Sequence, residues 1–346
     1  MSLTRFIGAG LGLGLSTLGA AEPAPALAER ATVVLVVGAE GEATYQAEFA
    51  AQVPRWQKVI AQAGAKGVVI GSGAPPADGT DAERLKAALA AEAQVGPGEL
   101  WVVLIGHGTF DGKEAKFNLR GPDLAATELA AWLKPFQRPL AVINTASASA
   151  PFIAKLAGPN RVVMTATRTG NEQNYARCGG FLAEAISDPK SDLDQDGQTS
   201  LLEAYLSAAA RVREYYKTEG RLATEHALLD DNGDGLGTPA EWFRGTRATK
   251  KAKDSSALDG TRARQFHLVR SEAEAKLTPE QRARRDELEL AVEALRETKA
   301  KVPEADYYRE LERLMLELAR VYCHRSLQNQ PPRVESKPAT LSGWFS

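Results

Sequence analysis

Five short apolar runs, each rich in β-branched residues, alternate with helical patterns in the first half of the chain. Apolar runs without alternation are typical of strands buried on both faces. The predicted strands are Thr32–Val37, Lys66–Ile70, Leu100–Ile105, Pro139–Ile143 and Arg161–Thr165, and the predicted helices are Tyr45–Ala63, Ala82–Ala91 and Ala126–Leu133. This alternation predicts an α/β fold, a parallel sheet with helices on both faces, in which function gathers at the carboxyl ends of the strands.

The composition excludes several classes of protein. The 346 residues suffice for two or three domains at roughly 150 residues each. Lys and Arg number 42 against 44 Asp and Glu, so no basic excess attracts nucleic acid. Hydrophobic residues at 44% and charged residues at 25% are typical of a globular protein and exclude a disordered chain or a multi-span membrane protein.

Residues 1–21 have the pattern of an export signal. Arg5 precedes an apolar stretch, Phe6–Leu18, and three small residues follow before Glu22. A buried N-terminal helix is the alternative, but four glycines in the stretch oppose it at about 1 kcal/mol each. No later run reaches the roughly 18 apolar residues that span a bilayer. We therefore expect a periplasmic or secreted protein with no membrane span in the mature chain.

The chain divides into six segments. After the signal, an α/β domain is expected over residues 30–186, a helical region with two acidic loops over 187–245, a linker over 246–264, a helical hairpin over 265–329 and a loose tail over 330–346. Thr278, Pro279 and Gln281 have the spacing of a helix N-terminus with a capping box, and a second helix begins at Pro303. The hairpin is expected to pack on itself or on the main domain, with a partner-binding coiled coil as the alternative.

The first acidic loop has the spacing of an EF-hand calcium loop. Alternate side chains of such a loop converge on one hard cation, a glycine permits the sharp turn, and an acidic residue at position 12 closes the shell. Gly197 provides the turn here. The predicted ligands are Asp192, Asp194, Asp196, the carbonyl of Gln198, Ser200 and Glu203. Unpaired carboxylates this close would repel one another, so calcium is the expected cofactor, bound permanently as a structural ion.

A second acidic loop repeats the pattern. Its predicted ligands are Asp230, Asn232, Asp234, the carbonyl of Leu236, Thr238 and Glu241. Helices are expected between the two loops at Leu201–Lys217 and Leu222–Leu229. Gly237 and Pro239 weaken the exit helix of the second loop, so a hydrated turn is an alternative to a calcium site.

Two polar residues follow neighbouring strands. His107 comes after the third strand and Ser147 after the fourth, and consecutive parallel strands often lie side by side. A serine beside a histidine is the minimum for a base-activated hydroxyl nucleophile. The alternative is that the small residues around Ser147 only allow a tight turn.

At this point the sequence resembles the legumain-like cysteine peptidases, which have the caspase-haemoglobinase fold. The likeness covers roughly residues 33–180. The legumain His-Gly pair matches His107-Gly108, and the nucleophile segment Glu-Ala-Cys-Glu-Ser-Gly lies over residues 145–150, with the cysteine on Ser147. The Gly-Ser-Asn-Gly and Tyr-Arg segments lie over residues 38–41 and 45–46, and Glu-Ser-Ser-Tyr-Ala lies over 172–176. The resemblance implies a three-layer caspase-haemoglobinase-like sheet followed by a helical C-terminal region.

The resemblance also implies roles for single residues. Glu40 falls on the asparagine that orients the catalytic histidine, and Gln46 replaces the arginine of the specificity pocket, so cleavage after asparagine is not expected. Glu172 begins the last matched segment beside the pocket. With serine in place of cysteine, Ser147 needs His107 as a general base, and the N–H groups of Gly108 and Ser147 would form the oxyanion hole.

Two functional hypotheses follow. One is a catalytically silent or weak exported module that binds a peptide or protein ligand through the strand-end cleft or the hairpin. The other is a peptidase or amidase with Ser147 as nucleophile and His107 as base. Export and the presence of two cysteines, Cys178 and Cys323, also predict one disulfide between the hairpin and the main domain. The sequence does not determine the oligomeric state.

Overall fold

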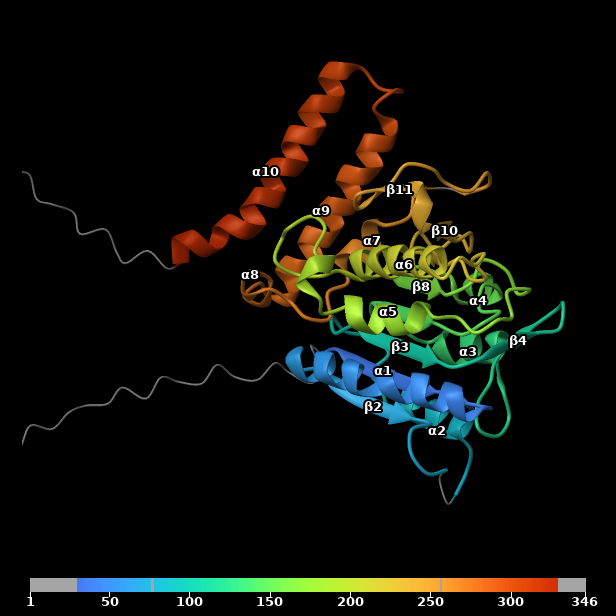
Figure 1. Cartoon of the computed structure of the whole chain (residues 1–346). Coiled ribbons are helices and arrows are strands. Elements are labelled where there is room, and N and C mark those ends of the chain that lie inside the picture. The colour runs from blue at the N-terminus through green and yellow to red at the C-terminus, as the bar shows by residue number, and fades with distance from the viewer. Residues whose placement is uncertain (1–29, 76–77, 256, 329–346) are drawn as a thin grey trace, which may run out of the picture.

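The structure, a computed structural model, describes residues 30–75, 78–255 and 257–328 (Figure 1). Its centre is a seven-stranded sheet in the order β10-β9-β8-β7-β3-β1-β2. Five strands are parallel: β1 (Thr32–Val37), β2 (Lys66–Ile70), β3 (Leu100–Ile105), β7 (Leu140–Asn144) and β8 (Arg161–Thr165). At one edge β9 (Leu228–Asp230) pairs antiparallel with β8, and β10 (Thr238–Pro239) pairs antiparallel with β9.

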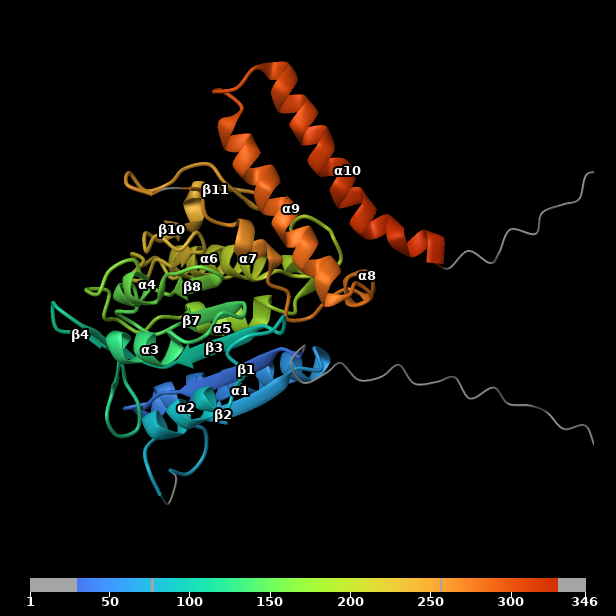
Figure 2. The ribbon, with the colours of Figure 1, turned by 180° about the vertical axis from the view of Figure 1, so that it is seen from behind.

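Helices cover both faces of the sheet (Figures 1 and 2). Along β1, Val33 and Leu35 are buried in one core with α1 (Ala43–Gln62), α5 (Cys178–Ala185) and α6 (Leu201–Thr218). Val34 and Val36 are buried in the other core with α2 (Asp81–Ala90), α3 (Ala126–Leu133) and α4 (Pro151–Leu156). The sequence predicted this three-layer α/β fold, and it is confirmed. The apolar runs of β1, β3, β7 and β8 form strands because both of their faces are excluded from water, whereas β2 at the sheet edge is only partly buried.

A small second sheet lies beyond the carboxyl end of β3. It consists of β4 (Gly108–Phe110), β5 (Ala115–Phe117) and β6 (Leu124–Ala125), all antiparallel. Phe117 is fully buried, and its ring lies against Gly38 and Gly106, which follow β1 and β3. The small sheet thereby holds the strand ends where the candidate site lies.

The segment between the acidic loops differs from the prediction. The expected helix over Leu222–Leu229 is wrong, because residues 221–227 are irregular and Leu228–Asp230 form β9. Leu229 is fully buried against the sheet and pairs with Met164 of β8, a long-range contact that local helix propensity does not report. The next short elements are η2 (Ala240–Trp242), β11 (Phe243–Arg244) and β12 (Arg247–Ala248).

The last part of the predicted linker over residues 246–264, residues 257–264, packs against the domain, whereas residues 249–254 are mostly exposed. Asp259 is buried, and its carboxylate accepts hydrogen bonds from the backbone N–H groups of Asp231 and Asn232 at 3.0 and 3.1 Å. Asp231 in turn accepts from the N–H groups of Gly260 and Ala263. These bonds fix the start of α7 (Thr261–Gln265), which precedes α8 (Glu272–Ala275).

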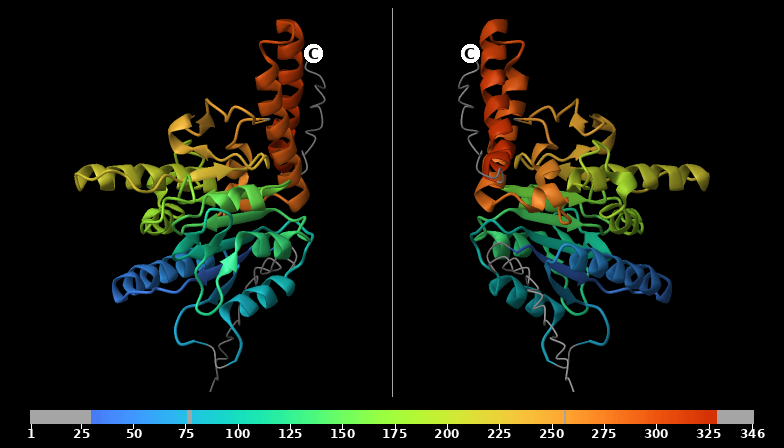
Figure 3. Two further views of the ribbon diagram at one scale, coloured as in Figure 1. Left: turned by 90° about the vertical axis from the view of Figure 1, so that its right-hand side faces the viewer. Right: turned by 90° about the vertical axis from the view of Figure 1, so that its left-hand side faces the viewer.

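The C-terminal helices form the predicted hairpin, α9 (Pro279–Thr298) and α10 (Glu304–Gln328). The capping box of Thr278 and Gln281 is present, and Leu288, Val292 and Leu314 form a small core between the helices. Figure 3 shows the hairpin standing away from the sheet.

The expected signal at 1–21 and the tail at 330–346 lie outside the described residues. In the part of the chain that the structure describes, no helix has the length and apolar character needed to cross a membrane.

Candidate functional site

Ser147 lies in the loop after β7, 2% exposed. Its hydroxyl donates a hydrogen bond to the Gly108 carbonyl at 3.0 Å, and its oxygen accepts one from the Gly108 N–H at 3.1 Å. A side chain at position 108 would place its Cβ 2.4 Å from the carbonyl oxygen of Ser147, so the close approach requires glycine. The hydroxyl of Ser147 is therefore committed to backbone groups rather than to the His107 ring. The Gly108 N–H, expected in an oxyanion hole, is used by the same contact.

The rest of the Ser147 loop is fixed by hydrogen bonds. The Thr145 hydroxyl donates to the Leu104 carbonyl at 2.8 Å, and the Ser149 oxygen accepts from the Ala166 N–H at 3.1 Å. Ala148 adopts a left-handed conformation with φ of 53°, and its N–H donates to the Glu172 carbonyl. A left-handed conformation is unfavourable for alanine, so these bonds hold a strained turn in place.

His107 lies at the same edge of the sheet in an aromatic cluster. Its ring centroid is 4.6 Å from that of Tyr45, 5.1 Å from that of Phe49 and 6.0 Å from that of Tyr175. Burial lowers the pKa of His107, and a hydrogen bond to the Glu40 backbone carbonyl opposes this shift only in part. The ring is thus a neutral imidazole at pH 7, packed as a partly apolar group.

The Glu40 carboxylate accepts a hydrogen bond from the side-chain amide of Gln46 at 3.1 Å. It is the backbone carbonyl of Glu40, rather than its side chain, that interacts with His107. Glu40, Gln46 and Arg120 line a cavity of about 170 Å³ between the ends of β1 and β2. Arg120 is held by the Asp81 carboxylate at 2.7 Å.

Glu172 interacts with a residue that sequence reasoning missed. Its carboxylate lies 2.6 Å from Nδ1 of His226 and accepts a hydrogen bond from the Arg168 N–H at 2.9 Å. His226 comes from the irregular segment before β9, and no motif or periodicity marks it. The pair connects that segment to the Ser147 loop through the Glu172 carbonyl.

The first acidic loop brings three of its predicted ligands together. The carboxylate oxygens of Asp192, Asp194 and Asp196 lie within 4.8 Å of one another. Burial and the neighbouring carboxylates, Glu203 first, raise the pKa of Asp194 to about 6. Gly197 makes the turn with φ of 88°.

The remaining predicted ligands of this loop have other partners. The Glu203 carboxylate accepts hydrogen bonds from the N–H groups of Leu193 and Asp194 at 2.7 and 3.1 Å, and from the Ser200 N–H and hydroxyl. Ser200 and Glu203 form the capping box of α6. The side-chain amide of Gln198, whose backbone carbonyl is the predicted ligand, donates a hydrogen bond to the Asp196 carboxylate. Three carboxylates with converging oxygens are a donor set that fits calcium, while Glu203 holds the loop against α6.

In the second acidic loop, three of the six predicted ligands bond to Ser255 or Asp259. Asn232 and Asp234 both bond to Ser255, and the Thr238 hydroxyl donates to Asp259 at 2.6 Å. The Asp230 carboxylate accepts from the N–H groups of Gly233 and Gly235. Leu236 is exposed, and Glu241 lines a different cavity together with Arg213 and Glu225. These contacts hold the loop in a hydrogen-bonded turn, and calcium at the second loop stays a prediction.

No family model matches the chain. No curated protein matches it either. Among solved structures, the chain is similar to the Drosophila initiator caspase Dronc, with 11% identity over 61% of this chain and 82% of that one and a TM-score of 0.37. It is also similar to caspase-1 from Spodoptera frugiperda, with 9% identity over 59% of this chain and 87% of that one and a TM-score of 0.38. Matches at this low identity assign no activity, so any activity has to be argued from the residues of this chain.

Cys178 is a free thiol, fully buried at the start of α5. This contradicts the predicted disulfide with Cys323, whose side chain lies outside the described residues. Burial, with the nearby Glu225, raises the pKa of the Cys178 thiol. A thiol of this kind is a packing residue and not a nucleophile.

Proposed function

We propose that the chain is a catalytically silent module of the caspase and legumain type, exported and stabilised by calcium, that acts by binding a peptide or protein ligand. The layered sheet and the positions of His107 and Ser147 at its carboxyl edge support this relationship. The signal-like pattern of residues 1–21 supports export. Fractionation of cells that express the full chain tests the export component, since retention of the unprocessed chain inside the cell would contradict it.

The observation that carries the silent function is the pair of hydrogen bonds between Ser147 and Gly108. A serine nucleophile needs a base that takes its proton and free N–H groups that stabilise the oxyanion. Here the proton is donated to the Gly108 carbonyl, and the Gly108 N–H is donated to the serine itself. The site lacks the thiol whose lower pKa would reduce its need for a base.

The calcium component rests on Asp192, Asp194 and Asp196, whose oxygens lie close enough for one cation. Burial and the nearby carboxylates of Glu203, Asp196 and Asp192 raise the pKa of Asp194, and Arg264 offsets this only in part. A divalent cation would remove this repulsion. Calcium would then stabilise the loop that links α5 to α6.

Labelling with a fluorophosphonate probe, which reacts with activated serines, tests catalytic silence. We expect no label on the folded full chain, while trypsin treated in parallel is labelled. Ser147→Ala and His107→Ala serve as matched variants. Labelling of the wild type that is lost in both folded variants would overturn the proposal and establish the hydrolase.

A further inference from the structure

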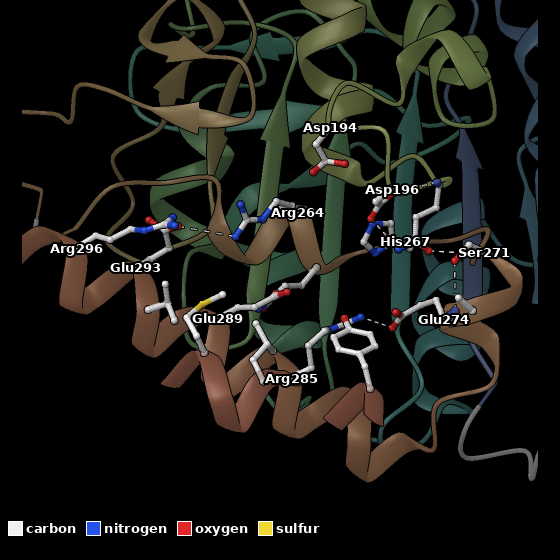
Figure 4. A pocket seen from close by; sticks show the side chains of 17 residues that line it. Asp194, Asp196, Arg264, His267, Ser271, Glu274, Arg285, Glu289, Glu293 and Arg296 are labelled. Atoms are coloured by element: carbon white, nitrogen blue, oxygen red, sulfur yellow. Dashed lines mark hydrogen bonds and ion pairs between the residues drawn. The ribbon is translucent and has the colours of Figure 1, made fainter. Parts of the chain in front are cut away.

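A cavity of about 100 Å³ lies at the amino edge of the sheet, where α7 and the start of α9 meet it. Two of its lining residues show this position, because Glu99 comes just before β3 and Pro139 just before β7. Ser147 follows β7 and lies at the opposite edge of the sheet. The cavity shares three lining residues with the larger cavity drawn in Figure 4, namely His267, Glu274 and Arg285.

Four guanidinium groups and three carboxylates line this cavity. They belong to Arg262, Arg270, Arg282, Arg285, Glu99, Glu274 and Asp286. Arg270 pairs with Glu99 at 3.1 Å. Arg285 pairs with both Glu274 and Asp286. These two arginines use all three carboxylates, so the other two guanidinium groups are left without an acid.

The two guanidinium groups without an acid are those of Arg262 and Arg282, and both residues are only partly exposed. Among the described residues Arg262 makes no hydrogen bond or ion pair, and Arg282 donates only to the Leu277 carbonyl. Burial lowers the pKa of Arg282, and the neighbouring charge of Arg270 lowers it further. A half-buried cation beside another cation is unfavourable unless an anion lies near both.

The electrostatic potential around this cavity is positive. Burial lowers the pKa of His267 to about 3, and the charges of three arginines, Arg285 first, add to the decrease. Pro279, the first residue of α9, lines the cavity, so the positive end of that helix dipole lies beside it. An anion is therefore the occupant that this potential favours.

The arrangement of the lining groups restricts the kind of anion. Guanidinium groups line the cavity from α7, from the loop before α8 and from α9, which suits an anion with oxygens on several sides. Ionised carboxylates only accept hydrogen bonds, so they favour an anion that keeps a hydroxyl group. Phosphate has such a hydroxyl at pH 7, whereas sulfate has none. The cavity volume admits one small anion of this kind.

We propose that this cavity binds inorganic phosphate. Arg262, Arg270 and Arg282 donate to its oxygens, and its hydroxyl donates to one of the lining carboxylates. Phosphate would join α7 to α9 and so fix the base of the hairpin. The site is at the other edge of the sheet from Ser147 and does not rest on the catalytic silence of that residue.

Calorimetric titration of the full chain, in buffer free of phosphate and sulfate, tests this site. The probes are sodium phosphate and sodium sulfate at equal ionic strength. We expect saturable one-site binding of phosphate and binding of sulfate that is weaker by about tenfold or more, since sulfate leaves the carboxylate without a donor. Equal affinities for the two anions would overturn the assignment to phosphate.

Arg262→Gln and Arg282→Gln each remove one guanidinium group that has no acid partner. We expect each to weaken phosphate binding by about tenfold or more, the scale of one charge-assisted hydrogen bond. Arg282→Gln also loses the contact with Leu277, whereas Arg262→Gln loses no contact with the described residues and tests the site without that change.

Arg320→Gln is the matched control. It makes the same change at an exposed position of α10 that does not line the cavity, and it should bind phosphate as the wild type does. Absence of saturable phosphate binding to the wild type would overturn the proposal. Affinities of the folded Arg262→Gln and Arg282→Gln variants equal to that of Arg320→Gln would overturn it as well.

Discussion

The hydroxyl of Ser147 and the backbone of Gly108 are joined by two hydrogen bonds, of 3.0 and 3.1 Å. One side chain thereby provides a partner for both the N–H and the C=O group of Gly108, which is buried. The two residues follow neighbouring strands, β7 and β3. The contact clamps the loops at the carboxyl edge of the sheet together. Ser147 thus has a structural role where a nucleophile would have a chemical one.

Replacing Ser147 should therefore reduce stability. Ser147→Ala leaves the buried N–H and C=O groups of Gly108 unpaired, which costs about 1–3 kcal/mol of unfolding free energy. Urea denaturation measures the change. Ser72→Ala, at an exposed serine, is the matched control and should stay within about 0.5 kcal/mol of the wild type. Equal stability of the two variants would contradict the clamp.

The sequence predicts the position of this site but not its internal geometry. That His107 and Ser147 lie at one edge follows from topology, because both come after buried parallel strands. The orientation of the Ser147 hydroxyl depends on the backbone of Gly108, which is 39 residues away along the chain. No pattern in the local sequence predicts a contact between residues so far apart along the chain. The Glu172–His226 pair was missed for the same reason.

The fold was predictable where one physical cause dominates. Burial on both faces defines β1, β3 and β8, whose observed bounds match the prediction. The bounds of β2 also match, although this strand lies at the sheet edge with Lys66 and Gly67 exposed. For Leu228–Asp230 helix propensity competes with strand formation, because the run Ala227-Leu228-Leu229 is compatible with a helix as well as with a strand. Pairing with β8 decides between them, and only the folded chain supplies that partner.

Protonation of His267 should destabilise the folded protein. Burial and the nearby Arg285 lower its pKa to about 3, whereas the unfolded chain has an ordinary value near 6.5. As the pH falls, the unfolded state therefore takes up the proton before the folded state does. The contribution of His267 to the free energy of unfolding is complete above about pH 6.5 and falls by up to about 1.4 kcal/mol per pH unit as the pH decreases toward 3.

Urea denaturation of the wild type and His267→Gln between about pH 7 and pH 5 measures this effect. The variant cannot take up this proton, so the stability of the wild type relative to the variant should fall as the pH is lowered. A constant difference across this range would show that His267 titrates normally in the folded protein.

The thiol of Cys178 should be unreactive in the folded protein. It is fully buried, and its raised pKa keeps it protonated at pH 8. In a Cys323→Ser background, a thiol reagent such as DTNB should find no reactive group in the native protein and one in denaturant. Rapid reaction of the native variant would mean that α5 opens or packs differently.

Calcium should raise the thermal stability of the protein through the first acidic loop. Binding to the folded state alone stabilises it by about 2.7 kcal/mol at a calcium concentration 100 times the Kd. Asp194→Asn removes one of three converging carboxylates, so it should raise the unfolding midpoint in chelator, where repulsion dominates, and diminish the shift that calcium produces. Asp254→Asn, at an exposed position outside both loops, should leave the midpoint and the calcium shift unchanged.

Scanning calorimetry with chelator and with excess calcium compares the wild type, Asp194→Asn and Asp254→Asn. Identical midpoints for the wild type in the two conditions would exclude a calcium ion from this loop, whereas an undiminished shift in Asp194→Asn would place the ion elsewhere in the chain.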